Sequence, residues 1–252
     1  MDRTRFSTIA HAAHDFCSPL DWPVLAELIG RAGLQPGDCV LDVGCGKAEL
    51  LLRLIRSSGV SGVGVDTNAV FLEEGRRQAL SLGIELGEGA GRLRLLQQSA
   101  ADFQAAPHSF ALACCVGAAH ALGDPGKAIA SLAAWTRPGG HVLLGEAFWQ
   151  REPAADYLAV LGAARSDHGT HAELLALGAA QGLSLIAAQV SRQAAWDRYE
   201  QLYAAGVEDY VARQPEDPDG AAMRERIRTW RAAYLHNGRG TFGFGLCLWR
   251  RP

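Results

Sequence analysis

Residues 40–52 read VLDVGCGKAELLL, a buried-strand pattern that runs into two glycines and then into a helical pattern. A glycine turn between a strand and a helix lets the backbone approach a ligand closely, because glycine has no side chain. A dinucleotide-binding turn of this kind needs a third small residue three positions after the second glycine, and Glu49 stands there. Its bulk and charge are unfavourable beside a pyrophosphate, so the dinucleotide interpretation is disfavoured.

The same turn follows a second spacing when it is counted from its acidic residue. An acid, two glycines and a further small residue occupy alternate positions: Asp42, Gly44, Gly46 and Ala48. A carboxylate at position 42 can meet an ammonium group, directly or through water. In this frame Glu49 begins the helix, where an acidic residue suits the helix dipole. The spacing favours a ligand with an α-amino group and no pyrophosphate, and the methyl of Ala48 is expected to change the approach of the loop only slightly.

Short apolar runs alternate with amphipathic stretches on both sides of this turn. The strand-like runs are 39–43, 62–66, 92–97, 110–116, 141–146, 183–190 and 241–249. The helical patterns between and around them are 22–33, 48–58, 69–83, 125–136, 171–182, 195–214 and 219–235. This alternation predicts βαβ units in an α/β fold, with a mostly parallel sheet of seven strands and helices on both faces.

The domain organisation follows from the same pattern. Residues 1–252 are predicted to form one domain with an N-terminal helical segment at 1–35, and Ser18 and Pro19 are expected to start the helix there. Two helices separated by QPEDPDG lie between the last two strands. An insertion there often covers the ligand edge of a sheet, so we expect 191–238 to form a helical lid.

Composition narrows the class of protein. Hydrophobic residues make up 48% of the chain, charged residues 20%, and the formal net charge is −3. Nucleic-acid binding is disfavoured because clustered Lys and Arg are absent apart from two adjacent pairs. The six cysteines show no metal-ligand spacing, so no metal is expected. No stretch approaches the roughly 20 apolar residues of a membrane span or the core of a signal peptide, which predicts a cytoplasmic protein without a membrane partner.

Several of these segments resemble the motifs of one family. VLDVGCGKAELL resembles the first motif of the class I S-adenosylmethionine-dependent methyltransferases, and Asp66 in GVGVDTN lies 24 residues after Asp42, where the family has an acidic residue. RLRLLQQSAADF is similar to the third motif and PGGHVLLGE to the turn into the fifth strand. The resemblance covers roughly residues 12–190 and implies the Rossmann-like fold of this family.

A narrower resemblance points to one group within the family. The chain is similar to bacterial small-molecule methyltransferases of the group that includes the ubiquinone and menaquinone C-methyltransferases. Its signals are HxxxxP from His14 to Pro19, GExxW from Gly145 to Trp149, WDRYE at 196–200 and a terminal FGxG strand.

The resemblance implies S-adenosyl-L-methionine as the cofactor. The segment from Asp42 to Gly46 would hold its methionine and ribose portions, and Asp66 would accept from the ribose hydroxyls. Ser99 and Ala100 would border the adenine, with a serine where the family commonly has an acid. The implied cofactor residues are Asp42, Gly44, Cys45, Gly46, Asp66, Thr67, Ser99, Ala100 and Val116.

The methyl acceptor should bind beyond the carboxyl ends of the fourth and fifth strands, where open α/β sheets hold their ligands. His120 follows the fourth strand and Glu146 ends the fifth. Both are candidate catalytic residues. An imidazole has a suitable intrinsic pKa for a general base, and a desolvated carboxylate can act as a base or bind a cationic acceptor. The alternative for His120 is a role in the turn alone.

Five further residues are candidates for contact with the substrate. Trp149, Trp196 and Tyr199 could form an aromatic wall against a flat or cationic molecule, or they could pack the lid helices on the sheet. Arg239 stands near glycines before the last strand and could hold a substrate carboxylate. His14 lies in a segment that folds over the cofactor in similar proteins.

The main hypothesis is a methyltransferase that acts on a small soluble acceptor by in-line displacement, as a monomer or homodimer. The nucleophile is left open among N, S, O and activated C. A nucleic-acid amino-methyltransferase is disfavoured because VGAAH stands where (D/N)PP(Y/F/W) would be expected. The alternative from another class is a cofactor-binding or regulatory protein that keeps the fold and methylates nothing.

Overall fold

The computed structural model describes residues 2–252, which divide into two compact units. The sheet unit comprises 21–146, 172–190 and 245–252, and the helical unit comprises 2–20, 147–171 and 191–244. Each unit is therefore assembled from segments that are distant in the sequence. The predicted single domain over 1–252, with its segments 1–35 and 191–238, stays a prediction.

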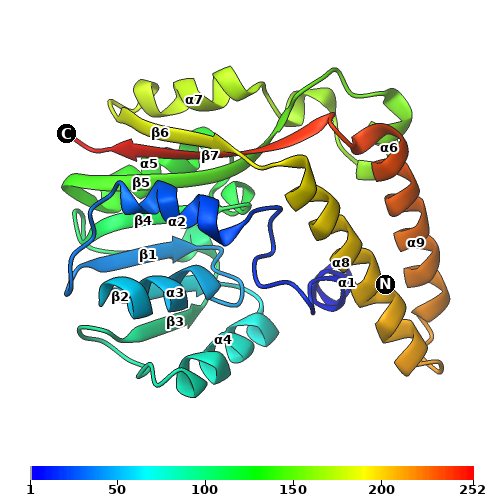
Figure 1. Ribbon diagram of the computed structural model, residues 1–252, viewed down its shortest axis with the longest axis horizontal. Helices are drawn as coiled ribbons and strands as arrows, with labels where there is room; N and C mark the ends of the chain where they lie inside the picture. Colours follow the sequence, from blue (N-terminus) through cyan, green and yellow to red (C-terminus); the bar gives the residue numbers. More distant parts are fainter. Residues whose placement is uncertain (1) are drawn as a thin grey trace. The chain divides into compact units, whose positions relative to one another are not determined.

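A seven-stranded sheet forms the centre of the sheet unit, with strand order β3-β2-β1-β4-β5-β7-β6 (Figure 1). Its strands are β1 (Cys39–Val43), β2 (Ser61–Asp66), β3 (Leu93–Gln97), β4 (Phe110–Val116), β5 (Thr136–Trp149), β6 (Ser184–Val190) and β7 (Phe242–Arg250). The pairs β1–β2, β1–β4, β2–β3 and β4–β5 are parallel, whereas β6 and β7 pair antiparallel. The predicted mostly parallel, Rossmann-like sheet is confirmed.

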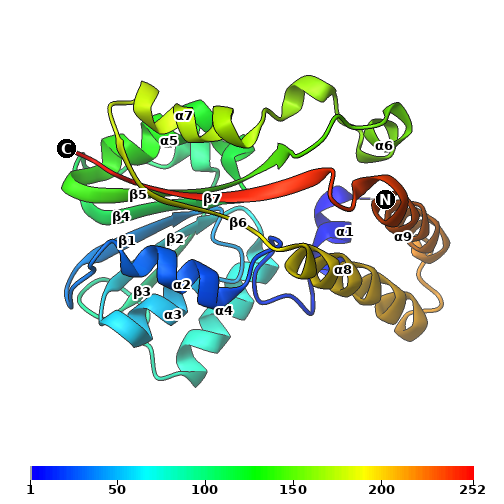
Figure 2. The same ribbon diagram turned by 45° about the horizontal axis from the view of Figure 1, so that its top comes forward.

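Helices cover both faces of this sheet (Figures 1 and 2). On one face lie α2 (Trp22–Gly30), α3 (Glu49–Ser58) and α4 (Ala69–Ser81), and on the other lie α5 (Pro125–Trp135) and α7 (His171–Ala180). Short 3-10 turns follow two strands, η1 (Ala100–Asp102) after β3 and η2 (Ala119–Leu122) after β4. Strand β4 is buried from Phe110 to Cys115 because helices cover it on both sides.

The helical unit contains α1 (Arg3–Ala10), α6 (Ala155–Leu161), η3 (Arg165–Asp167), α8 (Gln193–Arg213), α9 (Gly220–Ala233) and the π-helical turn η4 (Tyr234–Gly238). One apolar core joins α1, α8 and α9, and its buried members are Phe6, Ala10, Ala204, Val207, Val211, Met223 and Ile227. A Cβ at Gly206 would lie 2.8 Å from the carbonyl oxygens of Ile9 and Ala10. This glycine is therefore what allows α8 to pack closely on α1.

Most element boundaries agree with the sequence prediction to within a few residues, with two clear errors. Strand β5 runs from Thr136 to Trp149 and so extends beyond the predicted 141–146 at both ends. The start of the first predicted helix is also wrong. The helix predicted from Ser18 and Pro19 begins instead at Trp22, with Asp21 at the N-cap and Pro23 in the first turn. The amide of Leu20 donates to the carbonyl of Ser18 at 2.9 Å, so residues 18–20 form a turn. Two prolines were each able to start a helix, and the later one does so.

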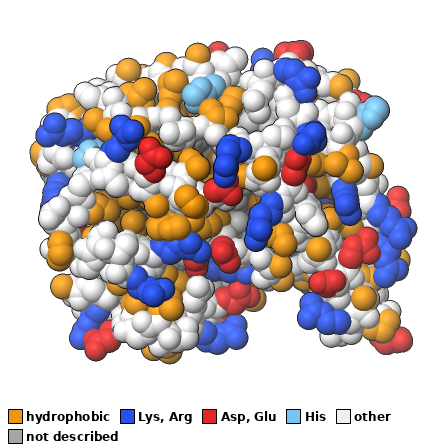
Figure 3. All heavy atoms as spheres, in the orientation of Figure 1, with side chains coloured by type: hydrophobic (Ala, Val, Ile, Leu, Met, Phe, Trp, Pro, Cys, Tyr) orange, Lys and Arg blue, Asp and Glu red, His pale blue; other side chains and the backbone are white. Residues whose placement is uncertain are grey.

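Among residues 2–252, no helix is both long enough and apolar enough to cross a membrane. On the face drawn in Figure 3, basic and acidic side chains are intermixed. That face carries no continuous stripe of one sign of charge.

Candidate active site

The glycine turn after β1 is held by backbone contacts that exclude larger residues. Gly44 and Gly46 have φ values of +73° and +53°, in the left-handed region that favours glycine. A Cβ at Gly44 would lie 2.2 Å from the Cβ of Ala118, so the turn closes directly against the chain that follows β4. The amides of Gly44 and Cys45 both donate to the carbonyl of Val65, at 2.8 and 3.1 Å. The turn is therefore tied to β2 as well as to β1.

Ala48 closes this turn in an unusual conformation. It is fully buried, it precedes the first residue of α3, and its φ of +61° lies in the left-handed region. An L-residue with a side chain pays about 1–2 kcal/mol there. From the sequence we expected the methyl group of Ala48 to change only slightly how closely the loop approaches the ligand. In the structure, its unfavourable free energy arises instead from the left-handed backbone conformation of Ala48.

Asp42 is a buried carboxylate at the end of β1. Its residue is only 4% exposed, and no group among residues 2–252 donates a hydrogen bond to its side chain. Burial, and to a smaller extent the charge of Asp66, raises the pKa of Asp42 to about 8. A buried carboxylate without a donor is stabilised by a cation. The site consequently fits a ligand with an ammonium or sulfonium group.

Asp66 braces the turn from the end of β2. One of its carboxylate oxygens accepts from the amide of Gly46 at 2.8 Å, and the other accepts from the amide of Asn68 at 2.8 Å. Asn68 in turn caps α4, with its side chain accepting from the amides of Val70 and Phe71. An ionised carboxylate has about four acceptor positions, so lone pairs remain for ligand hydroxyls. Thr67, between the two, is exposed.

The predicted adenine residues lie around the turn after β3. The hydroxyl of Ser99 accepts from the amide of Ala101 at 3.2 Å and so caps η1. Ala100 is buried, whereas Asp102 is exposed. Val116 ends β4 and is partly exposed. Capping leaves the hydroxyl hydrogen of Ser99 available to a ligand.

The two candidate catalytic residues come from the turn after β4 and from β5, which continues to Trp149 and does not end at Glu146 as predicted. His120 lies in η2 and is exposed, and Glu146 lies in β5 and is partly exposed. Val116 pairs with Gly145, and the amide of Gly117 donates to the carbonyl of Gly145 at 2.8 Å. Glu146 therefore directly follows the last residue pair between β4 and β5. Burial, then the charge of Asp42 and then that of Glu146 raise the pKa of the Cys115 thiol.

Trp149 and Trp196 are buried inside the helical unit, 3% and 7% exposed. Both pack against Phe242, with ring centroids 4.7 and 5.7 Å away. The indole N–H of Trp149 donates to the carbonyl of Arg165 at 2.9 Å, whereas that of Trp196 has no acceptor among residues 2–252. These contacts give both rings a packing role in the unit, and the aromatic wall stays a prediction.

His14 and Tyr199 belong to a second buried cluster of the same unit. A ring nitrogen of His14 lies 2.9 Å from the carbonyl oxygen of Tyr199, and a ring nitrogen of His11 lies 2.9 Å from the Tyr199 hydroxyl. The rings of Tyr199 and Tyr203 stack with centroids 6.0 Å apart. Burial raises the pKa of Tyr199 well above its usual value. The cluster fastens the segment after α1 to α8.

Arg239 is already paired. Its Nε and Nη2 donate to the two carboxylate oxygens of Asp197, each at 2.8 Å. Asp197 also accepts from the hydroxyl of Tyr234 at 2.7 Å, and these bonds, that of Arg239 first, lower its pKa to about 2. A substrate carboxylate would have to compete with Asp197 for this guanidinium. The sequence did not reveal the pair, because Asp197 and Arg239 are 42 residues apart.

Known proteins resemble the chain along most of its length. A family model described as a methyltransferase domain matches residues 40–140. A crystal structure of an S-adenosylmethionine-dependent methyltransferase from Thiobacillus denitrificans, in complex with S-adenosyl-L-homocysteine, is 29% identical, with a TM-score of 0.89 over 100% of both chains. A similar complex from Geobacter sulfurreducens is 28% identical, with a TM-score of 0.89 over 98% of both chains.

These similarities support a class I S-adenosylmethionine-dependent methyltransferase. Among curated relatives, the uncharacterized protein YjhP of Escherichia coli is 29% identical over 98% of both chains. The ubiquinone biosynthesis O-methyltransferase of Alkalilimnicola ehrlichii is 31% identical, over 60% of this chain and 56% of that one. The resemblance seen in the motifs is confirmed.

The helical unit of this methyltransferase also holds a titratable group that the sequence did not reveal. Glu200 on α8 is 5% exposed and accepts from the indole N–H of Trp230 on α9 at 2.8 Å. Burial raises its pKa to about 7. Glu200 stands at the end of the WDRYE motif, and only the pairing of α8 with α9 shows which partner it meets.

Glu200→Gln is expected to remove a pH dependence of stability. Because the folded pKa lies above the usual value of 4.5, the folded protein binds the proton more tightly, and the free energy of unfolding falls as pH rises from about 4.5 to 7. The glutamine oxygen keeps the bond from Trp230, so the variant should match wild type at pH 4.5 and exceed it at pH 8. Urea unfolding measured at both pH values checks this. Equal differences at the two pH values would contradict it.

Proposed function

We propose that this methyltransferase transfers the methyl group to a small-molecule nucleophile, with the cofactor bound at the glycine turn. The observation that carries the proposal is Asp42, a buried carboxylate without a donor at the end of β1, beside a turn whose glycines bring the backbone close to a ligand. An α-amino acid group attached to a nucleoside satisfies both features. When bound, S-adenosylmethionine supplies a methyl group on a positively charged sulfonium.

Each cofactor residue has a separate task in this proposal. Asp42 attracts the ammonium group, and the backbone from Gly44 to Gly46 follows the chain of the ligand. The remaining lone pairs of Asp66 accept from the ribose hydroxyls, which adds ligand bonds to the two amides that the carboxylate already holds. Ser99 and Ala100 border the adenine.

The acceptor is proposed to bind beyond β4 and β5, where His120 and Glu146 lie. Most of the acceleration comes from holding the nucleophile in line with the methyl group, which can contribute about 7–11 kcal/mol. His120 or Glu146 would take the proton of an amine, thiol or hydroxyl, a contribution of about 10²–10⁴-fold. The neutral-to-acidic character of these residues supports a neutral or cationic acceptor of low molecular weight.

Binding and turnover test this function in two steps. Calorimetry would compare S-adenosylmethionine, S-adenosylhomocysteine and NAD, and we expect only the first two to bind. Methyl transfer would then be followed by mass spectrometry on a panel of amines, thiols, phenols and activated carbon acids. Binding of NAD alone would overturn the proposal. Cofactor binding without turnover on the whole panel would favour the regulatory alternative.

His120→Gln and Glu146→Gln separate the two candidate bases. With an acceptor from the panel, replacing the residue that takes the proton should lower kcat of the enzyme by about 10²–10⁴-fold. The affinity for S-adenosylhomocysteine should stay unchanged. Replacement of the other residue should change KM more than kcat. If both variants retain full kcat across pH 6–9, neither residue is the general base and positioning alone accounts for the rate.

Asp42→Asn should increase the stability of the ligand-free protein and weaken cofactor binding. The pKa of Asp42 is about 8 in the folded protein against 3.8 for an ordinary aspartate, so its ionised form lowers the free energy of unfolding as pH rises between these values. Each unit of difference corresponds to about 1.4 kcal/mol. The neutral amide removes this cost at pH 8, and it also removes the attraction for the ammonium group.

The measurement is urea unfolding of wild type and variant at pH 5 and pH 8, with calorimetry of S-adenosylhomocysteine at pH 8. The stability difference should grow from pH 5 to pH 8 while affinity falls at least tenfold. A variant that binds the cofactor as tightly as wild type would show that Asp42 does not face the amino group.

A further inference from the structure

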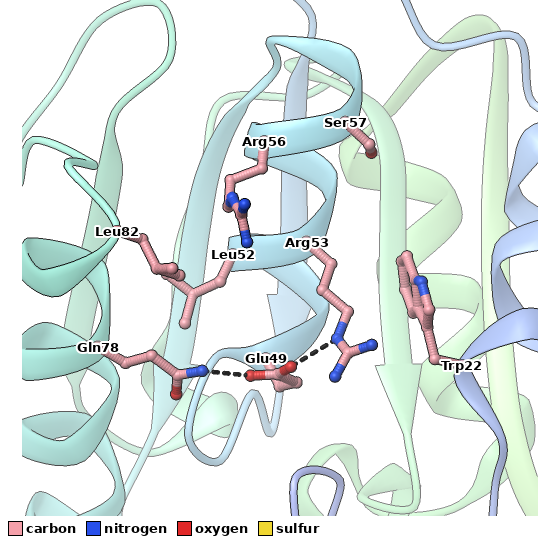
Figure 4. A pocket seen from close by; sticks show the side chains of 8 residues that line it. All are labelled: Trp22, Glu49, Leu52, Arg53, Arg56, Ser57, Gln78 and Leu82. Carbon is pink, nitrogen blue, oxygen red and sulfur yellow. Dashed lines mark hydrogen bonds and ion pairs between the residues drawn. The ribbon is translucent and has the colours of Figure 1, made fainter.

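A hollow of about 520 Å³ lies on the outer surface of α3 in the sheet unit (Figure 4). Its lining comes from α2, α3, α4 and the residue that follows α4, and consists of Trp22, Glu49, Leu52, Arg53, Arg56, Ser57, Gln78 and Leu82. The residues proposed for the cofactor and the acceptor do not line it. Its volume lies within the range of about 300–1,000 Å³ that is usual for small-molecule sites.

Charge in the hollow is unevenly compensated. Glu49 accepts from Arg53 and from the side-chain amide of Gln78, the latter at 2.9 Å, so its negative charge is satisfied inside the lining. Arg56 is exposed and has no hydrogen bond or ion pair among residues 2–252. In Figure 4 its guanidinium extends along α3 towards Leu52, between α4 and Arg53. The lining thus presents one unpaired positive charge.

Apolar surface accompanies this charge. Leu82 is 37% exposed at the rim, and Leu52 forms part of the floor. Trp22 lies on the opposite side of α3 from Gln78 in Figure 4, and the guanidinium of Arg53 stands 5.0 Å from its ring centroid. A flat group can lie against Leu82 and Trp22 while its anionic end meets the guanidinium of Arg56.

We infer that this hollow is a second ligand site, which binds a small organic anion in which a flat apolar group carries a phosphate or a carboxylate. Arg56 supplies the ionic contact and can pair with either anion in bidentate fashion. Leu82 and Trp22 contact the flat group. The inference requires no step of the methyl transfer.

The test uses 1-naphthyl phosphate and 2-naphthoate as probes, with calorimetry on the full chain saturated with S-adenosylhomocysteine. Saturation keeps the probes out of the proposed cofactor site. We expect the protein to bind at least one of the two probes, and the tighter one identifies the preferred anionic group. Inorganic phosphate has only the anionic group and 1-naphthol has only the flat group, so each should bind at least tenfold more weakly.

Variants locate the binding. Arg56→Gln should weaken binding of the probe by about tenfold, which corresponds to one lost charge-assisted hydrogen bond. Trp22→Leu should weaken binding of the probe severalfold. The matched control is Arg77→Gln, because Arg77 is an exposed arginine on α4 that lies outside the hollow. It should bind like wild type, and melting curves would show that all variants fold.

Three results would overturn the inference. Failure of both probes to bind, unchanged affinity in Arg56→Gln, or an equal loss in Arg77→Gln would each do so. Because the readout is binding of the probe, a failed methyl-transfer assay would not affect it. If S-adenosylhomocysteine itself does not bind, the proposed function fails, and the same titration without it still tests the hollow.

Discussion

Replacing Gly44 by alanine is expected to abolish cofactor binding and to destabilise the sheet unit by about 2–5 kcal/mol. The added Cβ would lie 2.2 Å from the Cβ of Ala118, and the backbone φ of +73° is unfavourable for any residue with a side chain. Overpacking of a filled site costs about 1–3 kcal/mol, and left-handed strain adds about 1–2. The turn can relieve the clash only by moving away from the position that we propose for the ligand.

Gly83→Ala is the matched control for this substitution. Gly83 has nearly the same φ, +72°, but a Cβ there meets nothing within 4 Å. It should therefore cost only the strain, about 1–2 kcal/mol, and leave cofactor affinity intact. The double variant Gly44→Ala with Ala118→Gly removes the opposing methyl and should recover part of the affinity. Equal effects of the two single variants, in urea unfolding and calorimetry, would show that contact with Ala118 is unimportant.

Asp66→Ala is expected to weaken binding of S-adenosylhomocysteine by about 10²–10⁴-fold. The carboxylate holds the amides of Gly46 and Asn68 at 2.8 Å each, and we propose that it also accepts from the ribose hydroxyls. Hydrogen bonds to charged groups are worth about 1.5–3 kcal/mol each, and two of them account for this loss. The released turn should also lose order, because two amides become unpaired.

Calorimetry measures this loss, and hydrogen exchange at Gly46 and Asn68 measures the released amides. Asp102→Ala is the matched control, since Asp102 is an exposed acid after the next strand. It should leave both quantities unchanged. Loss of affinity in the control variant, with normal binding in Asp66→Ala, would mean that the acid at the end of β2 does not hold the ribose.

Much of the sheet unit was predictable from local sequence. The strand at 39–43 and the strand at 110–116 begin and end where the apolar runs do, because strands buried on both faces require continuous apolar residues. The glycine turn was predictable because its residues are adjacent in the chain. The helix start predicted at Ser18 and Pro19 was wrong, because local signals show only where a helix can start and packing decides which start is used.

The helical unit was less predictable from its sequence. Its helices were recognisable from their patterns, but their partners were not. Trp149 and Trp196 meet at Phe242, and Arg239 meets Asp197, across separations in sequence that no local pattern records. Residues proposed for the substrate from their chemical type alone thus have packing and ion-pair partners that only the folded chain reveals.

The sequence by itself determined the family, the order of the strands along the chain and the positions of the turn glycines, because these depend on residues close together in the chain. Only the tertiary structure decided that Ala118 closes against Gly44, that Asp66 holds the amide of Gly46, and that Asp42 is buried without a donor. Desolvation and steric contact depend on which atoms surround a group, and those atoms come from strands and loops that are distant in the sequence.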